Sequence, residues 1–329
     1  MEKSFISLLK LPDLAFAHIY LKLFHEKNAL IIFTFHTLFK NEEEITLNHV
    51  NPHLGTTLDH FRQFVEYYLN HDYSFISHND ILNGLDCNQN YIMATFDDGY
   101  FNNIHVLPIL KKFKIPAIFF VSTGHIMNNK CFWWDVSYRQ RVKLGTSFRK
   151  IRREEYQLKT KTNRDIEKHL IAMFGKDVFH PLSDIDRPFT PLELKDFCKE
   201  KYVFIGNHTS DHAILRNCSP HEIKSQMLGA QDFIYDLTGI YPSIISYPDG
   251  YYSDEVIRIS KEIGFQLGVT TDFKKNYLPI DCQKDKCMRL GRFDLGGCTE
   301  PLKLCELFRS NVVFYKWIEN FFNKRYQKR

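Results

Sequence analysis

The most constraining feature of this sequence is the alternation of short apolar runs with longer stretches of helical character. Six runs predict strands that helices cover on both faces, at 30–35, 92–96, 117–121, 203–206, 244–247 and 265–269. Strands that alternate with helices are typical of parallel sheets joined by right-handed crossovers. With 329 residues, the chain can form one large α/β domain.

Several of the predicted helices have readable ends. Thr190 and Ser219 each begin a capping box with proline at the first helical position. Ser253 caps a helix that ends at Gly264, and 107–113 forms another. These signals place helices between the strands, as an α/β fold requires.

The chain divides into a main domain, 29–310, and two terminal segments. We expect a helical extension at 1–28 and a charged helical insertion at about 128–188. A tail at 311–329 is aromatic and ends with four Lys or Arg. Two interpretations of this tail are open: a solvated chain end, or a peripheral contact with an anionic membrane surface.

Composition and charge limit the classes of partner that the chain can bind and the cellular compartment in which we expect it. The net charge is +4 and the basic residues are scattered, which argues against nucleic acid as a partner. No apolar run near the start approaches the ~20 residues of a transmembrane segment. The eight cysteines lack C-x-x-C spacing. We therefore predict a cytoplasmic protein with free thiols, for which a peripheral contact with the inner membrane is the alternative location.

Reactive polar residues follow four of the predicted strands. His36 follows the first, Asp97 and Asp98 the second, His208 the fourth and 248–250 the fifth. Because the carboxyl ends of parallel strands open onto one face, these groups should meet there. The sequence therefore predicts a site at this face.

The residue types in this set suit metal chemistry. In the turn 97–99, one carboxylate can bind a cation while its neighbour takes a proton from water. His208 and His212 are spaced i, i+4, so a helical segment would place both on one face. Two imidazoles and one carboxylate suit zinc, cobalt, nickel or iron(II).

These residues resemble the motifs of a known family. The sequences T-F-D-D-G at 95–99 and H-T-x-x-H at 208–212 are similar to the first two motifs of the NodB-homology polysaccharide deacetylases, carbohydrate esterase family four. The sequence Y-P-D-G at 247–250 resembles a variant of the third motif. The resemblance covers roughly residues 29–272.

The resemblance implies a distorted (β/α) barrel of the NodB-homology type with a helical insertion. It also implies metal-dependent hydrolysis of an N-acetyl, or an O-acetyl, group on a sugar. Position by position, Asp97 matches the catalytic base, and Asp98, His208 and His212 match the metal ligands. Zinc is the metal first expected, with cobalt or nickel as alternatives.

Substrate contacts are expected from five further residues. Tyr100, through its backbone N–H, would hold the oxyanion. The matching third motif adds Tyr247 and Pro248. Trp133 and Trp134 would either stack on a sugar ring or pack in the core.

The sequence departs from the family pattern in three places, one of which is the motif whose Asp and Trp support the catalytic acid, for which 272–273 is only a faint counterpart. Ser246 stands where an Arg often orients the base, and the Leu-x-His motif that carries the usual general acid is missing; 289–292 lies there instead. An amide leaving group needs a proton, so we expect His36, or after it His125, to supply it. A structural role for His36 is the alternative.

The predicted function is deacetylation of an amino sugar during synthesis of a surface polysaccharide or similar glycan. A cytoplasmic location would make the substrate a nucleotide- or lipid-linked sugar. The alternative is an inactive carbohydrate-binding relative that retains the metal site. An iron(II) oxygenase would also use this ligand set, but its usual fold is an antiparallel barrel.

Overall fold

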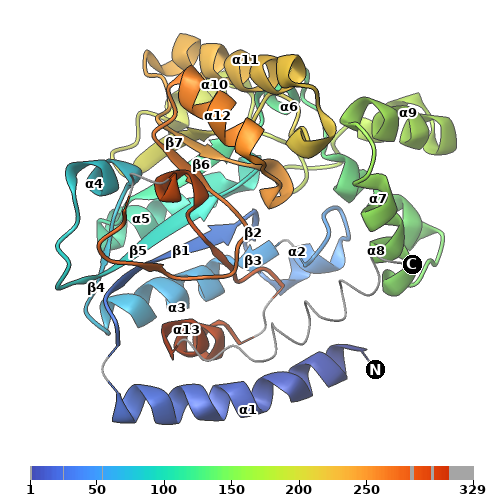
Figure 1. Ribbon diagram of the computed structural model, residues 1–329. Helices are drawn as coiled ribbons and strands as arrows, with labels where there is room; N and C mark the ends of the chain where they lie inside the picture. Colours follow the sequence, from blue (N-terminus) through green and yellow to red (C-terminus); the bar gives the residue numbers. More distant parts are fainter. Residues whose placement is uncertain (1, 25, 54, 282–284, 298–299, 311–329) are drawn as a thin grey trace.

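The structure is a computed structural model that describes residues 2–24, 26–53, 55–281, 285–297 and 300–310 (Figure 1). Its main sheet has the strand order β10-β1-β5-β6-β7-β8-β9, with β4 also on β5 and β11 also on β1. The strands are β1 (Ala29–Phe35), β4 (Tyr73–Phe75), β5 (Asn90–Phe96), β6 (Ala117–Val121), β7 (Val203–Asn207), β8 (Ile244–Ser246), β9 (Leu267–Val269), β10 (Asn276–Tyr277) and β11 (Phe293–Asp294). A second small sheet pairs β2 (Thr37–Phe39) with β3 (Gly55–Thr57).

Helices cover the sheet and fill the connections between its strands. They are α1 (Glu2–Leu23), α2 (Glu42–Thr46), α3 (Leu58–Leu69), α4 (His78–Asn83), α5 (Leu107–Phe113), α6 (Thr123–Asn128), α7 (Trp133–Lys143), α8 (Phe148–Leu158), α9 (Asn163–Phe174), α10 (Pro191–Phe197), α11 (Pro220–Thr238), α12 (Asp254–Ile263) and α13 (Pro301–Ser310).

The predicted strands and helix ends are confirmed. All six predicted strands form, and the central pairs β1–β5, β5–β6, β6–β7, β7–β8 and β8–β9 are parallel. The capping boxes at Thr190 and Ser219 are both present. Ser253 caps α12, and Gly264 ends it in the left-handed conformation.

The core explains much of the high phenylalanine content. Residues from β1, α3, β5 and β6 interlock on one face of the sheet, where Phe35 contacts Phe64 edge to face at 5.2 Å and Phe96 stacks on Phe119 at 4.9 Å. These rings are fully buried. Offset and edge-to-face pairs of this kind add to the free energy gained by burial alone.

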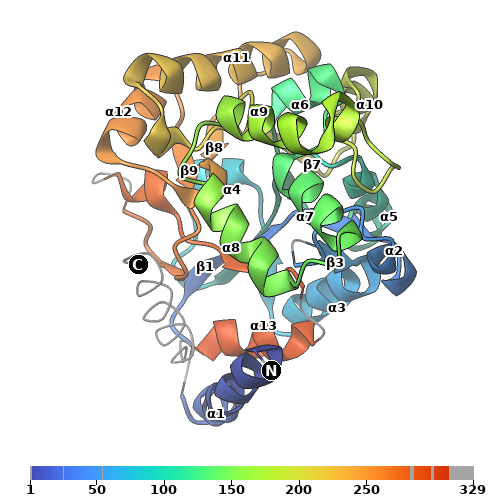
Figure 2. The ribbon, with the colours of Figure 1, turned by 90° about the vertical axis from the view of Figure 1, so that its right-hand side faces the viewer.

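The insertion lies on the side to which the parallel strands direct their carboxyl ends. Figure 1 shows α7, α8 and α9 beyond those strand ends, and Figure 2 shows α8 passing across that face. The first helix of the chain, α1, packs against the last described helix, α13, and His18 of α1 pairs with Glu306 of α13 at 2.6 Å. The insertion helices are therefore placed to contribute to any site at the strand ends.

The prediction of free thiols throughout is wrong, because Cys287 is disulfide-bonded. Cys87, Cys131, Cys198 and Cys218 are free thiols. Disulfides are typical of oxidising compartments, so the cysteines do not argue for the cytoplasm. Among the described residues, no helix is both long and apolar enough to span a bilayer. The basic aromatic tail at 311–329 lies outside the described residues.

Candidate active site

The turn after β5 places Asp97 and Asp98 side by side at the strand ends. Asp98 and Gly99 are both left-handed, with φ of 76° and 89°, which reverses the chain directly after the strand. A Cβ on Gly99 would meet Val121 at 3.2–3.3 Å, so both the positive φ and the close approach to β6 favour glycine. Both aspartates are buried, with 3% and 1% of their surface exposed.

The histidine segment after β7 is a loop and not the helical segment in which the i, i+4 spacing would place both imidazoles on one face. Thr209 and His212 have φ of 65° and 50°, which a right-handed helix does not allow. The loop still brings the two imidazoles together, with ring centroids 4.7 Å apart. The left-handed conformations of Thr209 and His212 let this loop bring the two imidazoles together without a helix.

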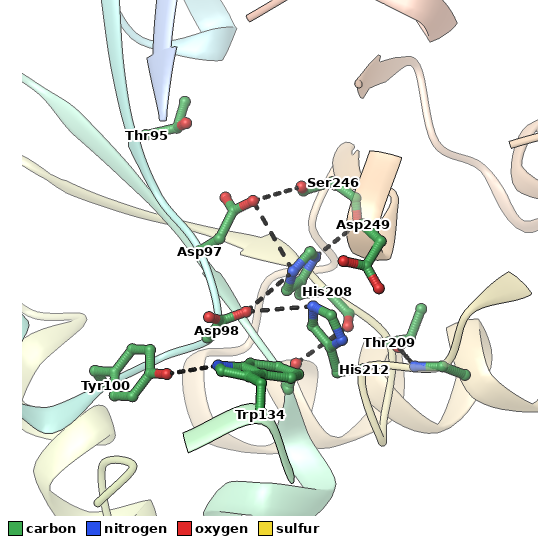
Figure 3. Close-up of polar contacts among 12 residues, drawn as sticks. Thr95, Asp97, Asp98, Tyr100, Trp134, His208, Thr209, His212, Ser246 and Asp249 are labelled. Carbon is green, nitrogen blue, oxygen red and sulfur yellow. Dashed lines mark hydrogen bonds and ion pairs between the residues drawn. The ribbon is translucent and has the colours of Figure 1, made fainter. Parts of the chain in front are cut away.

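Asp98, His208 and His212 form a cluster that can hold a metal ion. Their ligand atoms all lie within 4.8 Å of one another, and Asp98 Oδ1 is 3.4 Å from Nε2 of each histidine (Figure 3). Neither oxygen of Asp98 has a hydrogen-bond partner among the described residues, although both are buried. A cation between the three groups would satisfy these oxygens, so the residues fit zinc or a similar divalent ion.

Hydrogen bonds orient the candidate ligands. His208 Nδ1 is 2.8 Å from the carbonyl of Ser246, which leaves Nε2 directed at the cluster. In the loop, Asn207 accepts from the Thr209 amide at 2.8 Å, and Thr209 Oγ1 accepts from the Ala213 amide at 3.0 Å. Burial, strengthened by the charge of His208, lowers the pKa of His212 well below its usual range, and a neutral imidazole is the ligand form.

Arg292 is the main site residue that sequence reasoning missed. Its guanidinium binds both oxygens of Asp97 at 2.8 Å, and it also donates to Thr95 Oγ1 and to Ser246 Oγ. Burial alone would raise the pKa of Asp97, but the charges of Arg292 and then His208 outweigh it, so the carboxylate stays ionised.

Ser246 belongs to the same network. Its hydroxyl donates to Asp97 Oδ2 at 3.1 Å and accepts from Arg292. Ser246 stands where the family often has an Arg, and here it contacts Arg292, which lies elsewhere in the sequence. The sequence shows that the segment 289–292 ends in an Arg. Nothing in that segment indicates which strand end the side chain of Arg292 reaches. Next to Ser246, Tyr247 and Pro248 are buried, and their contact with a substrate stays a prediction.

Tyr100 and the two tryptophans form a buried support beside the cluster. Trp133 and Trp134 are 2% and 8% exposed, and each packs in a cluster with Tyr100 and Phe132. The Trp134 indole donates to the Tyr100 hydroxyl at 3.0 Å, and that hydroxyl donates to Asp135 at 2.5 Å. The Trp134 ring lies 4.5 Å from the His212 ring, so it packs against a candidate ligand, and its stacking on a sugar stays a prediction.

The two candidate acids occupy different surroundings. His36 is half-buried at the end of β1, and its Nδ1 has no partner among the described residues. His125 is fully enclosed, stacks on Phe132 at 4.3 Å and bonds through Nδ1 to the Lys130 carbonyl. Only His36 therefore keeps both a free ring nitrogen and partial access to solvent.

Solved structures of similar fold are deacetylases. The Streptococcus pyogenes deacetylase PplD matches with a TM-score of 0.58 and 19% identity, over 85% of this chain and 98% of that one. IcaB from Ammonifex degensii matches with a TM-score of 0.57 and 16% identity, over 87% of this chain and 98% of that one. At such identities the likeness shows the fold, and it confirms the predicted NodB-type barrel.

A sequence relative and a family model carry the comparison further. YxkH of Bacillus subtilis (strain 168), assigned to the polysaccharide deacetylases, is 30% identical over 105 residues, which is 32% of this chain and 36% of YxkH. The sequence model described as "Polysaccharide deacetylase" matches residues 85–268, more than half of the chain. That range contains the aspartate turn, the histidine loop and the Ser246 strand end. The chain belongs to the polysaccharide deacetylase family.

Proposed function

We propose that the chain is a metal-dependent deacetylase that hydrolyses an N-acetyl group on a sugar. The observation that carries the proposal is the pairing of a buried Asp98–His208–His212 cluster with an ionised carboxylate, Asp97, beside it. His208 Nε2 is 3.9 Å from Asp97 Oδ2, so base and cluster are adjacent. Family membership supports the reaction class.

Each residue then has a distinct task. A divalent ion held by Asp98, His208 and His212 supplies Lewis-acid polarisation of the acetyl carbonyl and an acidified water, with zinc the metal we expect first. Asp97 accepts the proton of the attacking water, and Arg292 and Ser246 fix the direction of its carboxylate. The Tyr100 N–H donates to the developing oxyanion.

His36 completes the reaction as the proton donor. When the C–N bond breaks, the leaving amine needs a proton, and the half-buried imidazole at the end of β1 is the available donor. An O-acetyl substrate has a better leaving group and depends on this proton less. The acid role of His36 is therefore specific to amide substrates.

The inactive carbohydrate-binding alternative is less well supported by the geometry. Binding a metal requires Asp98 but not a second carboxylate. Asp97 nevertheless accepts three hydrogen bonds from Arg292 and Ser246, and a fourth links these two residues to each other. Holding a buried carboxylate ionised in this way is costly without a use for it as a base.

The test is acetate release from a panel of N-acetylated sugars. Polymeric, nucleotide-linked and lipid-linked donors all belong in the panel, because the disulfide at Cys287 removes the cysteine argument for a cytoplasmic substrate. Asp97→Asn should abolish release while the metal stays bound. Metal-replete wild-type protein that releases no acetate from any donor would favour the carbohydrate-binding alternative.

A further inference from the structure

A lysine of the helical insertion reaches the mouth of the candidate active site. Lys159 directly follows α8, and its ammonium donates to Asp249 Oδ1. Asp249 lies in the turn after β8, at φ 56°, next to the strand end that carries Ser246. In the view of Figure 3, Asp249 lies on the side of the cluster where His208 and Ser246 lie.

This ion pair is more open to solvent than the cluster behind it. The Lys159 and Asp249 side chains are 27% and 15% exposed, whereas those of Asp98 and His208 are 2% exposed. Burial alone would lower the pKa of Lys159, but the Asp249 carboxylate outweighs it and keeps the pKa above its usual value. The pair is therefore more accessible to a ligand from solvent than the cluster is, and the charge of Lys159 acts on His212.

Two asparagines fix the position of Lys159 against the histidine loop. Asn217 Nδ2 donates to the carbonyls of Lys159 at 3.1 Å and Lys161 at 3.2 Å. Asn163 Nδ2 donates to the carbonyl of His212 at 3.0 Å. The segment after α8 is thus attached to the same loop that holds two of the candidate ligands.

The neighbouring polar atoms of the insertion have unused hydrogen-bonding capacity. Glu155 Oε1, one turn before Lys159, and Asn163 Oδ1 are buried and have no partner among the described residues. Burial, opposed by the charge of Lys159, raises the pKa of Glu155 to about 7. The ammonium of Lys159 offers three donors, of which the described bond to Asp249 uses one. A ligand rich in hydroxyl groups has the complementary chemistry.

We propose that the Lys159–Asp249 pair binds hydroxyl groups of the sugar whose acetyl group lies at the Asp98–His208–His212 cluster. The proposal rests on the proposed function and adds to it a substrate-positioning pair supplied in part by the insertion. Lys159 donates to a hydroxyl oxygen and Asp249 accepts from a hydroxyl group, so together they bind two adjacent hydroxyl groups of the sugar. A purely structural ion pair that ties the insertion to the barrel is the competing explanation.

The first experiment measures sugar affinity without relying on turnover. Calorimetry on the metal-free full-length chain uses tetramers of N-acetylglucosamine and N-acetylgalactosamine as probes, and compares wild type with Lys159→Met and Asp249→Asn. Each variant should bind the better probe about tenfold more weakly, as expected for one lost charge-assisted hydrogen bond. The double variant should lose little more than either single one, because the two residues act as a pair. Lys150→Met, an exposed lysine on α8, is the matched control and should bind like wild type.

The second experiment separates sugar binding from a structural role. In the reversed pair, Lys159→Asp with Asp249→Lys, an ion pair can form again, so the melting temperature should recover relative to the single variants. Sugar affinity should stay low, because donor and acceptor have exchanged places. The proposal is overturned if the single variants bind within twofold of wild type, if neither probe binds wild type, or if the reversed pair restores affinity together with the melting temperature. Failure of the proposed function would give a different result. The substitutions would still weaken sugar binding, but the metal-loaded wild type would release no acetate.

Discussion

At the scale of single residues, the most important contact is the bidentate ion pair between Arg292 and Asp97. A guanidinium matches both carboxylate oxygens at once, which fixes the direction of the base as well as its charge. A second strand end contributes through Ser246. The base is thus held by residues that lie 149 and 195 positions away in the sequence, and only the fold brings them together.

Arg292→Lys should lower kcat by about 10- to 100-fold, because lysine keeps a positive charge but loses the two-pronged geometry. Metal content should not change, since Arg292 does not contact Asp98 or the histidines in this structure. Steady-state kinetics with parallel elemental analysis measures both. Arg289→Lys, in the same segment but paired with exposed Asp254, is the control and should be unaffected. Equal kcat in the two variants would contradict this role of Arg292.

His36→Ala should reduce turnover of an N-acetyl sugar by about 100-fold, because the leaving amine loses its proton donor. Hydrolysis of 4-nitrophenyl acetate should change little, since its leaving group departs as an anion. The comparison of the two substrates, with bound metal recorded, gives the answer. Near-normal turnover of the amide by the metal-loaded variant would leave His36 with a structural role.

At the scale of elements, the strand ends were predictable and the loops between them were not. Apolar runs and capping boxes identified β1, β5, β6, β7 and β8, and parallel pairing then required their polar ends to meet. The i, i+4 spacing of the two histidines fits a helix, but the segment forms a loop. Positive φ at Thr209 and His212 cannot be read from the residue types, because it is uncommon for any residue other than glycine, although histidine is enriched there.

Long-range placement was the other limit. Lys159 belongs to an insertion whose charged sequence predicted helices but not the surface on which they would pack. Arg292 follows the last long strand in an irregular segment with no periodic pattern. Both residues reach the site through tertiary packing, and a single sequence carries no local signal for such contacts.

Thr209→Val tests the histidine loop as an element. Valine keeps the shape of the side chain but removes the acceptor for the Ala213 N–H, which is then left buried without this partner. We expect zinc affinity to fall about tenfold, measured by competition with a chelating dye. Thr238→Val, at the end of α11 and remote from the site, should retain wild-type affinity. If both variants hold zinc as wild type does, the hydroxyl does not steady the ligands.

At the scale of the whole molecule, burial of neutral histidines links stability to pH. Burial lowers the pKa of His78 to about 4, and burial together with the charge of Lys130 does the same for His125. The unfolded chain binds these protons near pH 6.5, whereas the folded chain resists them until about pH 4. The stabilisation is therefore fully present above pH 6.5 and is lost progressively as the pH falls toward 4.

His78→Leu should make this loss smaller. Between pH 7 and pH 5, the variant should lose roughly 2 kcal/mol less of its unfolding free energy than wild type, because one group no longer takes up a proton on unfolding. Urea denaturation at both pH values measures the difference. His180→Leu removes a histidine whose side chain is 76% exposed and should behave like wild type. An unchanged pH dependence in His78→Leu would show that His78 does not make this contribution.

The central claim, that a metal at Asp98, His208 and His212 enables sugar deacetylation, is tested most directly by reconstitution. Metal-free protein is titrated with zinc while acetate release from an N-acetylated sugar is followed. From this claim we expect no release without metal, a linear rise to a plateau at about one zinc per chain, and no recovery in His208→Ala. Release that persists without metal and is insensitive to chelators would contradict it, as would stoichiometric zinc binding without release from any donor.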